Sequence, residues 1–249
     1  MIGLFLNFHV SLIINLLKME REKESAILLG ATGLVGSHLL ERLLEDEHYS
    51  QVKVFSRRPV GLSHPKLTEV LIDLFELENY REEFTADVVF VCIGTTRKKT
   101  PDLETYRKVD YGIPYTAAKL ASQNGVKKFL VVSALGADAG SRIFYSRTKG
   151  EMEEAVLAQK IPKTYIFQPS LITGDRKETR VGESAGEKIM KVVNPLLFGS
   201  WKKFRSIKAS TIATSMHMVA CHGFYASRIP SDEIQDIADH YQDIKDRKN

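Results

Sequence analysis

The sequence predicts a doubly wound α/β domain built on a parallel sheet. Three observations support this class. Apolar runs of strand length alternate with helical patterns from residue 25 onward, a glycine-rich turn joins the first run to the first helical pattern, and residues 87–94 are apolar almost throughout, as in a central strand buried on both faces. The chain has 249 residues, 43% of them hydrophobic, enough for one large α/β domain or two small ones.

The elements follow in βαβ order, which implies right-handed crossovers. A helix is expected over residues 33–44, and another from Pro101, with Thr100 as its predicted N-cap. The strands that we expect are residues 26–29, 52–55, 67–74, 87–94, 127–134 and 164–172.

After residue 173 the alternation fades. We expect a loop over residues 174–186, a helix over 185–197 that Asn194-Pro195 ends or bends, and a strand leading into a helix within 205–223. Ser231 is the predicted N-cap of a last amphipathic helix. Core packing is the favoured interpretation of the large apolar side chains in this part of the chain. For the aromatic Phe198, Trp201 and Phe204 the alternative is the lining of an apolar cavity, and Met216 and Met218 belong to the core or its rim. His217 and His222 have no evident partner.

Gly30, Gly33 and Gly36 form a GxxGxxG turn between the first strand and the first helix. In such a turn the first glycine permits the tight bend, the second lets the backbone approach a phosphate, and the third allows close helix–strand packing. The free N–H groups at the helix start favour a pyrophosphate. The turn therefore predicts a dinucleotide site, with a merely tight βα corner as the alternative.

The residues after the second strand favour NADP(H) over NAD(H). NAD sites usually carry an acidic residue about 20 positions after the glycines, where this chain has Arg57 and Arg58. Two guanidinium groups suit a 2′-phosphate in charge and geometry, whereas the alternative is an exposed basic turn. Asp73 is placed to meet the adenine or to cap a turn. Backbone after the fourth strand can approach the cofactor at Ile93, Gly94 and Thr95.

Ser133 follows the fifth strand, and Tyr145 and Lys149 lie at i and i+4 on one face of the next predicted helix. An ammonium beside a phenol lowers the pKa of the phenol, so Tyr145 could exchange a proton with an alcohol or a carbonyl. Ser133 could hydrogen-bond the same substrate oxygen. We predict that these three residues are catalytic; the alternative is a Tyr–Lys pair with no role.

The segments GATGLVG, FSRRP, CIGTT, VVSALGAD, YSRTKGEME and QPSLITGDR resemble, in this order, the atypical short-chain dehydrogenase/reductases. The chain is most similar to the Tat-interacting-protein-type oxidoreductases and their bacterial relatives, from residue 25 to about 219. The resemblance implies a Rossmann-type fold and hydride transfer between NADP(H) and a small carbonyl or alcohol substrate. It also implies that Tyr145 and Lys149 form the catalytic pair, and that cofactor contacts come from Thr32, Gly33, Leu34, Val35, Arg57, Arg58, Ile93, Ile172 and Arg180.

The chain departs from the family pattern at three places. Gln168 stands where an arginine usually precedes the proline, Ser170 replaces the following glycine, and the asparagine of the wider superfamily's tetrad is replaced in its neighbourhood by Asp110. Two alternatives to the oxidoreductase therefore stay open. One is a catalytically weak NADPH-sensing interaction protein, and the other is an isomerase or epimerase of a nucleotide sugar.

Charge and cysteine content narrow the partners and the location. The net charge is +4, and neither of the short basic clusters, at 97–99 and 202–205, is interleaved with aromatic residues over any length, so we expect no nucleic-acid partner. The two cysteines, Cys92 and Cys221, form no CxxC motif and no Cys/His cluster with metal-ligand spacing. We therefore expect no metal and a reducing, cytoplasmic location.

The first 18 residues are apolar but interrupted by polar side chains, and they are shorter than the roughly 20 residues that a spanning helix needs. We expect a mis-called start upstream of Met19, with a membrane-surface helix or a packing helix as alternatives, and no stable membrane insertion. Residues 19–249 are expected to form a single domain in which 173–249 provide the substrate side. A protein partner or a homo-oligomer stays open.

Overall fold

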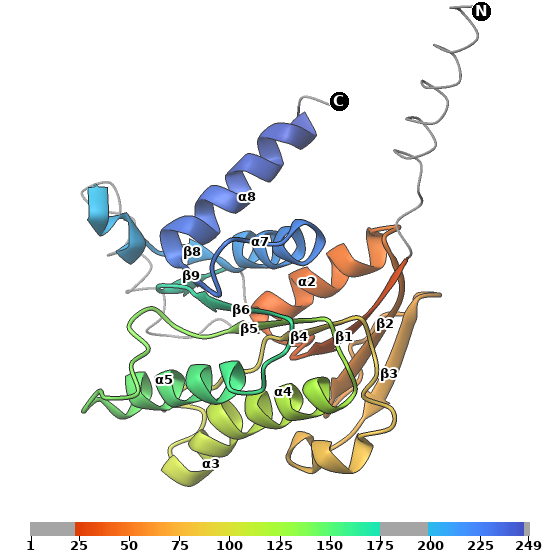
Figure 1. Ribbon diagram of the computed structural model, residues 1–249, viewed down its shortest axis with the longest axis horizontal. Coiled ribbons are helices and arrows are strands. Elements are labelled where there is room, and N and C mark those ends of the chain that lie inside the picture. Colours follow the sequence, from red (N-terminus) through yellow and green to blue (C-terminus); the bar gives the residue numbers. More distant parts are fainter. Residues whose placement is uncertain (1–22, 175–198, 247–249) are drawn as a thin grey trace, which may run out of the picture.

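The computed structural model describes residues 23–174 and 199–246, and a seven-stranded parallel sheet forms their centre (Figure 1). The strand order is β3-β2-β1-β4-β5-β6-β9, and every neighbouring pair is parallel. The strands are β1 (Glu24–Leu29), β2 (Tyr49–Ser56), β3 (Leu67–Leu71), β4 (Val88–Val91), β5 (Lys128–Val132), β6 (Lys163–Gln168) and β9 (Arg228–Pro230). Successive strands are added on one side of β1 as far as β3 and then on its other side from β4 onward. The boundary between β1 and β4 is thus the topological switch point, at which doubly wound folds bind ligands. The predicted fold class is confirmed.

Helices cover both faces of this sheet (Figure 1). One face carries α2 (Leu34–Glu45), α7 (Ala209–His222) and α8 (Ser231–Asp246). The other carries α3 (Leu103–Arg107), the π-helical turn η2 (Lys108–Gly112), α4 (Ile113–Gln123) and α5 (Phe144–Leu157). Shorter elements are the 3₁₀ helices η1 (Leu74–Tyr80) and η4 (Gly199–Phe204) and a two-stranded sheet of β7 (Ile172–Thr173) and β8 (Ile207–Lys208).

The central strand β4 explains how the two layers are held together. All four of its side chains are buried; Val88 and Phe90 pack with the α2–α7 layer, and Val89 and Val91 pack with the α4–α5 layer. Side chains alternate across a strand, so an uninterrupted apolar run supplies both cores at once. In the described ranges, no helix combines the length and the apolar character needed to cross a membrane.

Several element boundaries differ from the sequence expectation. The third strand ends at Leu71 rather than at residue 74, because Asp73 caps η1 and accepts a hydrogen bond from the Phe75 N–H at 3.0 Å. The helix expected from Pro101 begins two residues later. The carboxylate of Asp102, not Thr100, accepts the Thr105 N–H at 2.7 Å.

The sixth strand and the C-terminal part also differ. Strand β6 ends at Gln168, since Pro169 lacks an N–H to continue the ladder, and residues 172–173 pair with β8 instead. Strand β9 was not predicted; at three residues it is too short to leave a periodic pattern. Ser231 begins α8, but its hydroxyl accepts the Ser170 N–H at 3.2 Å. The strand and helix expected within 205–223 are confirmed as β8 and α7. The expectations for residues 1–18, for the helix over 185–197 and for nearly all of the 174–186 loop lie outside the described residues.

Candidate dinucleotide and catalytic site

The glycine-rich turn lies where β1 ends and α2 begins. Gly30 has a φ of +88°, and a Cβ there would lie 2.5 Å from the Cys92 carbonyl oxygen. A Cβ on Gly36 would lie 2.0 Å from the Gly30 carbonyl oxygen, so only glycine permits this contact between turn and helix. Gly33 is the N-cap of α2, and no described side chain caps that end. The first N–H groups of α2 are thus left for an anion such as a pyrophosphate.

The paired arginines leave β2 at the same edge of the sheet. Arg57 and Arg58 are exposed, and neither guanidinium has an ion-pair or hydrogen-bond partner among the residues that the structure describes. The Ser56 hydroxyl donates to the Arg58 carbonyl oxygen at 2.8 Å and thereby fixes the turn. Two cations held on an ordered turn fit a phosphate group.

The remaining predicted contacts occupy the ends of neighbouring strands. Ile93 and Gly94 follow β4; the Ile93 backbone nitrogen lies beside Gly30, whereas Gly94 lies beside the Asp110 and Lys149 side chains. The Thr95 N–H donates to the Asp110 carboxylate at 2.8 Å. Asp73 serves as the cap of η1, which is the second of the two roles that its position allowed.

The other cofactor contacts implied by the resemblance divide between described and undescribed residues. Thr32 is exposed at the glycine turn, whereas Val35 is buried in the first turn of α2. Ile172 is half-buried in β7. Arg180 lies outside the described residues.

A buried ion pair stands beside this edge. Lys149 Nζ lies 2.8 Å from Asp110 Oδ1, and the two side chains are 4% and 1% exposed. Lys149 belongs to α5 and Asp110 to η2. Tyr145, four residues before Lys149, is 41% exposed in the first turn of α5. The structure thus brings Tyr145, Lys149 and Asp110 together, with the phenol on the open side.

Electrostatics at Tyr145 differ from the sequence expectation. Burial raises the pKa of Tyr145 above its ordinary value, the ammonium of Lys149 acts to lower it, and the carboxylate of Asp110 adds to the rise. The predicted influence of Lys149 is present, but burial outweighs it. The net shift of the Tyr145 pKa is upward because burial and the carboxylate of Asp110 together outweigh the ammonium of Lys149. Tyr145 therefore holds its proton at neutral pH.

Ser133 is engaged in a way that the sequence did not indicate. Its hydroxyl donates to the buried carboxylate of Glu153 at 2.6 Å. Glu153 also accepts from Gln168 Nε2 at 2.9 Å and from Arg228 Nε at 2.7 Å. The hydroxyl hydrogen of Ser133 therefore points to Glu153. Glu153 lies one turn after Lys149 on α5, and this i+4 spacing is the signal that could have found it.

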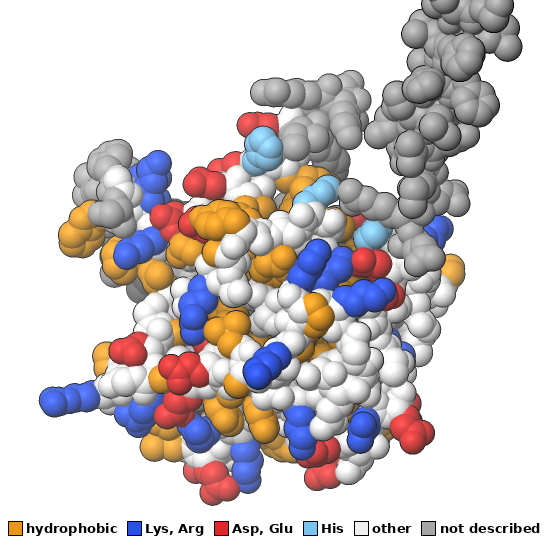
Figure 2. Space-filling model, in the orientation of Figure 1, with side chains coloured by type: hydrophobic (Ala, Val, Ile, Leu, Met, Phe, Trp, Pro, Cys, Tyr) orange, Lys and Arg blue, Asp and Glu red, His pale blue; other side chains and the backbone are white. Residues whose placement is uncertain are grey.

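Large apolar side chains are exposed near the carboxyl edge. Trp201 and Phe204 are 63% and 46% exposed, and their ring centroids are 6.0 Å apart on η4. The Ile207 N–H donates to the Leu171 carbonyl oxygen at 2.9 Å, which joins the segment after η4 to the loop after β6. The expected core packing is thus wrong for Trp201 and Phe204. Figure 2 shows orange and blue side chains together over η4, while acidic and basic side chains are interspersed over the rest of this face.

Comparisons with known proteins agree with this geometry. A family model described as NAD(P)H-binding matches residues 30–193. Protein HTATIP2 of Rattus norvegicus is 30% identical over 201 residues, which are 79% of this chain and 81% of that protein. "Protein FMP52, mitochondrial" of Meyerozyma guilliermondii is 36% identical over 176 residues, covering 70% and 76% of the two chains.

Solved structures share the fold at low identity. MoeE5 in complex with UDP-glucose and NAD has a TM-score of 0.61 at 16% identity, over 88% of this chain and 82% of that one. A UDP-glucose 4-epimerase of Thermotoga maritima with UDP-glucose has a TM-score of 0.59 at 16% identity, over 78% and 72%. At these identities the likeness shows the fold alone.

The relatives' names contradict one expectation. Six FMP52 relatives are named mitochondrial, so the predicted cytoplasmic location is wrong. The physical reason is that a low cysteine content separates reducing from oxidising compartments but does not distinguish one reducing compartment from another.

Proposed function

The chain belongs to the NAD(P)H-binding family as an atypical short-chain dehydrogenase/reductase, and we propose that it is an NADP(H)-dependent oxidoreductase for a small carbonyl or alcohol substrate. The observation that carries the proposal is the partly exposed Tyr145 one helical turn before Lys149, whose ammonium is buried against Asp110, at the edge of the sheet that carries the glycine turn. Bound nicotinamide would supply or accept the hydride at the substrate carbon.

The cofactor would be held by residues already described at this edge. Gly30 and Gly36 keep the turn and α2 in close backbone contact, since a Cβ at either would collide with a carbonyl oxygen, and the free N–H groups at the start of α2 would bind the pyrophosphate. Arg57 and Arg58 would hold the 2′-phosphate, which supports NADP(H) over NAD(H). Further contacts are assigned to the backbone of Gly94 and Thr95 after the fourth strand. The positions implied by the family supply the rest: Thr32, Leu34, Val35, Ile93, Tyr145, Lys149, Ile172 and Arg180.

Proton transfer is the chemistry that this chain's own residues would perform. Tyr145, protonated at neutral pH, would donate its hydroxyl proton to the substrate oxygen as negative charge develops there. Lys149, held at 2.8 Å by Asp110, would then stabilise the phenolate that remains. The protonated phenol is the form that carbonyl reduction requires. Ser133 would position the same oxygen when its hydroxyl hydrogen turns from Glu153 toward the substrate.

The segment from residue 173 to the C-terminus would form the substrate side within a single domain of residues 19–249. The exposed apolar side chains Trp201, Phe204 and Leu171 support a substrate with an apolar part.

A substitution at Tyr145 tests the proposal. Tyr145→Phe removes the transferable proton and keeps the ring, so kcat for NADPH oxidation over a panel of aldehydes, ketones and quinones should fall by about 10²–10⁴-fold. The NADPH Kd, measured by fluorescence, should stay within about twofold of the unsubstituted chain, since the hydroxyl is not needed for phosphate binding. An unchanged kcat on a verified substrate would refute the role of Tyr145.

The engagement of Ser133 with Glu153 favours one second candidate, an NADPH-binding sensor with little turnover. In that case NADPH would bind tightly and no carbonyl of the panel would be reduced. We also extend the mitochondrial location of the FMP52 relatives to this chain, and fractionation of cells that express a tagged copy tests it.

A further inference from the structure

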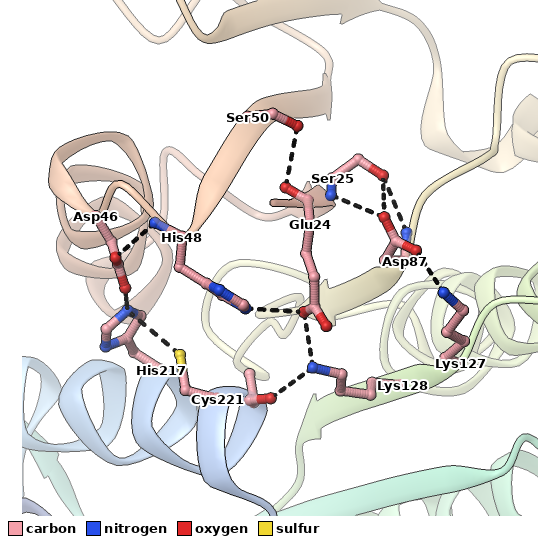
Figure 3. Close-up of polar contacts among 11 residues, drawn as sticks. Glu24, Ser25, Asp46, His48, Ser50, Asp87, Lys127, Lys128, His217 and Cys221 are labelled. Carbon is pink, nitrogen blue, oxygen red and sulfur yellow. Dashed lines mark hydrogen bonds and ion pairs between the residues drawn. The ribbon is translucent and has the colours of Figure 1, made fainter. Parts of the chain in front are cut away.

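Three side chains of metal-ligating type lie together at the amino edge of the sheet, opposite the dinucleotide site and between α2 and α7 (Figure 3). Asp46 is the C-cap of α2, and His217 and Cys221 lie on α7. One ligand atom from each of the three residues lies within 4.8 Å of the other two. His217 Nε2 is 2.6 Å from Asp46 Oδ2 and 3.9 Å from Cys221 Sγ.

The backbone explains why these three side chains converge. His217 and Cys221 are at i and i+4, so they project from one face of α7. Helices α2 and α7 pack together over the same sheet face, and the end of α2 brings Asp46 to that face of α7. The sequence expectation that His217 has no partner is therefore wrong, because its partner comes from 171 positions away.

The distances suit a tetrahedral cation after a small adjustment. With metal–nitrogen and metal–oxygen bonds of about 2.1 Å and a metal–sulfur bond of about 2.3 Å, tetrahedral ligands stand about 3.4 Å (N···O) and 3.6 Å (N···S) apart. The carboxylate and imidazole would separate by about 0.8 Å, and the thiol would approach by about 0.3 Å. Side-chain rotation covers such shifts.

The surroundings orient the three ligands and favour positive charge. The His48 N–H donates to Asp46 Oδ1 at 2.9 Å, which leaves Oδ2 to face His217. The buried Tyr49 hydroxyl interacts electrostatically with Cys221 and makes no other hydrogen bond among the described residues, so it is free to act as an outer partner of a metal-bound sulfur. The C-terminal carbonyl groups of α2 add negative potential.

The nearby charged groups balance one another. Glu24 lies 2.7 Å from Lys128 and 3.3 Å from His48, and Arg42 of α2 acts electrostatically on His217. The carboxylate of Asp46 is thus the negative charge that lies next to His217.

We propose that Asp46, His217 and Cys221 form a zinc site that ties the end of α2 to α7, with water as the fourth ligand. One sulfur, one imidazole nitrogen and one carboxylate oxygen are ligand types that Zn²⁺ accepts. Asp46 and Cys221 are half-buried, so solvent can reach the open position. The site is at the far edge of the sheet from the glycine turn, so its role is structural.

Metal titration of the full-length chain tests the site. After chelation and buffer exchange, calorimetry with Zn²⁺ should give one site per chain, and the melting temperature should rise with zinc. Co²⁺ in place of Zn²⁺ should give the near-ultraviolet charge-transfer band of a thiolate–cobalt bond. NADPH affinity should be unchanged by chelation.

Matched variants identify the ligands. Cys221→Ser should abolish the cobalt charge-transfer band and weaken zinc binding at least tenfold, whereas Cys92→Ser and His222→Ala, which alter the other cysteine and a neighbouring histidine, should leave both unchanged. Absence of zinc binding at micromolar concentration, or a cobalt spectrum of the unsubstituted chain without the thiolate band, would overturn the proposal. The cobalt measurement needs no variant, so a failure of Cys221→Ser to fold would not protect the proposal.

Discussion

Lys149 and Asp110 form an ion pair in the interior, and its disruption by Lys149→Met should cost more than any surface substitution. The methionine keeps most of the side-chain volume but removes the ammonium group 2.8 Å from Asp110 Oδ1. Asp110 then retains the Thr95 N–H at 2.8 Å as a hydrogen-bond donor, but its charge is left unpaired at 1% exposure.

The expected magnitude follows from that burial. Removing one partner of a buried ion pair costs about 3–5 kcal/mol of unfolding free energy, because the remaining charge is uncompensated. For a chain of this size, 1 kcal/mol corresponds to roughly 2–4 °C in melting temperature. Lys149→Met should therefore lower the melting temperature by about 6–20 °C.

Urea unfolding of a double-mutant cycle measures this cost. Asp110→Asn removes the unpaired charge while its side-chain oxygen can still accept the Thr95 N–H, so the double variant Lys149→Met/Asp110→Asn should recover at least about 2 kcal/mol relative to Lys149→Met. A loss below about 1 kcal/mol for Lys149→Met, or a double variant no more stable than that single variant, would refute the reasoning.

Three further outcomes are expected. Gly36→Ala puts a Cβ 2.0 Å from a backbone carbonyl oxygen, so the thermal stability and the NADPH affinity should both fall, as measured by thermal melts and fluorescence titration; unchanged values would contradict the close contact. The double variant Arg57→Ala/Arg58→Ala should weaken NADPH binding at least about tenfold and leave NADH binding unaltered, and equal losses for both nucleotides would exclude a phosphate-reading role. Asp110→Asn removes a charge that raises the pKa of Tyr145, so the phenol should deprotonate at lower pH. Carbonyl reduction needs the protonated phenol, so the alkaline fall in kcat/KM should move to lower pH, and an unmoved profile would exclude Tyr145 as the proton donor.

Local patterns were sufficient to predict the sheet and the glycine turn. The role of a run such as Val88–Val91, or of Gly30 and Gly36, depends on side-chain size and period within a few residues, and these are visible in a single sequence. The N-cap of α3 is Asp102, two residues after the predicted Thr100, because threonine and aspartate are both good N-cap residues. The sequence contains no local rule that chooses between them.

Contacts between distant residues could not be predicted in the same way. The pair Glu153–Arg228 spans 75 positions, and its effect on Ser133 depends on β9, which has three residues. Likewise, the pKa of Tyr145 rises because burial and Asp110 outweigh Lys149, and burial is a property of the folded chain. The spacing of Tyr145 and Lys149 predicts the pair but not the balance of these effects.

The carboxylate of Glu153 has a consequence for the order in which the protein is made. Its cationic partner, Arg228, lies 75 positions later in the chain, so it is synthesised long after the strand that ends before Ser133. A carboxylate enclosed in protein without a counter-charge is costly. The nascent chain can therefore assemble β1 to β5 early, but helix α5 can pack fully against the sheet only after Arg228 has been synthesised.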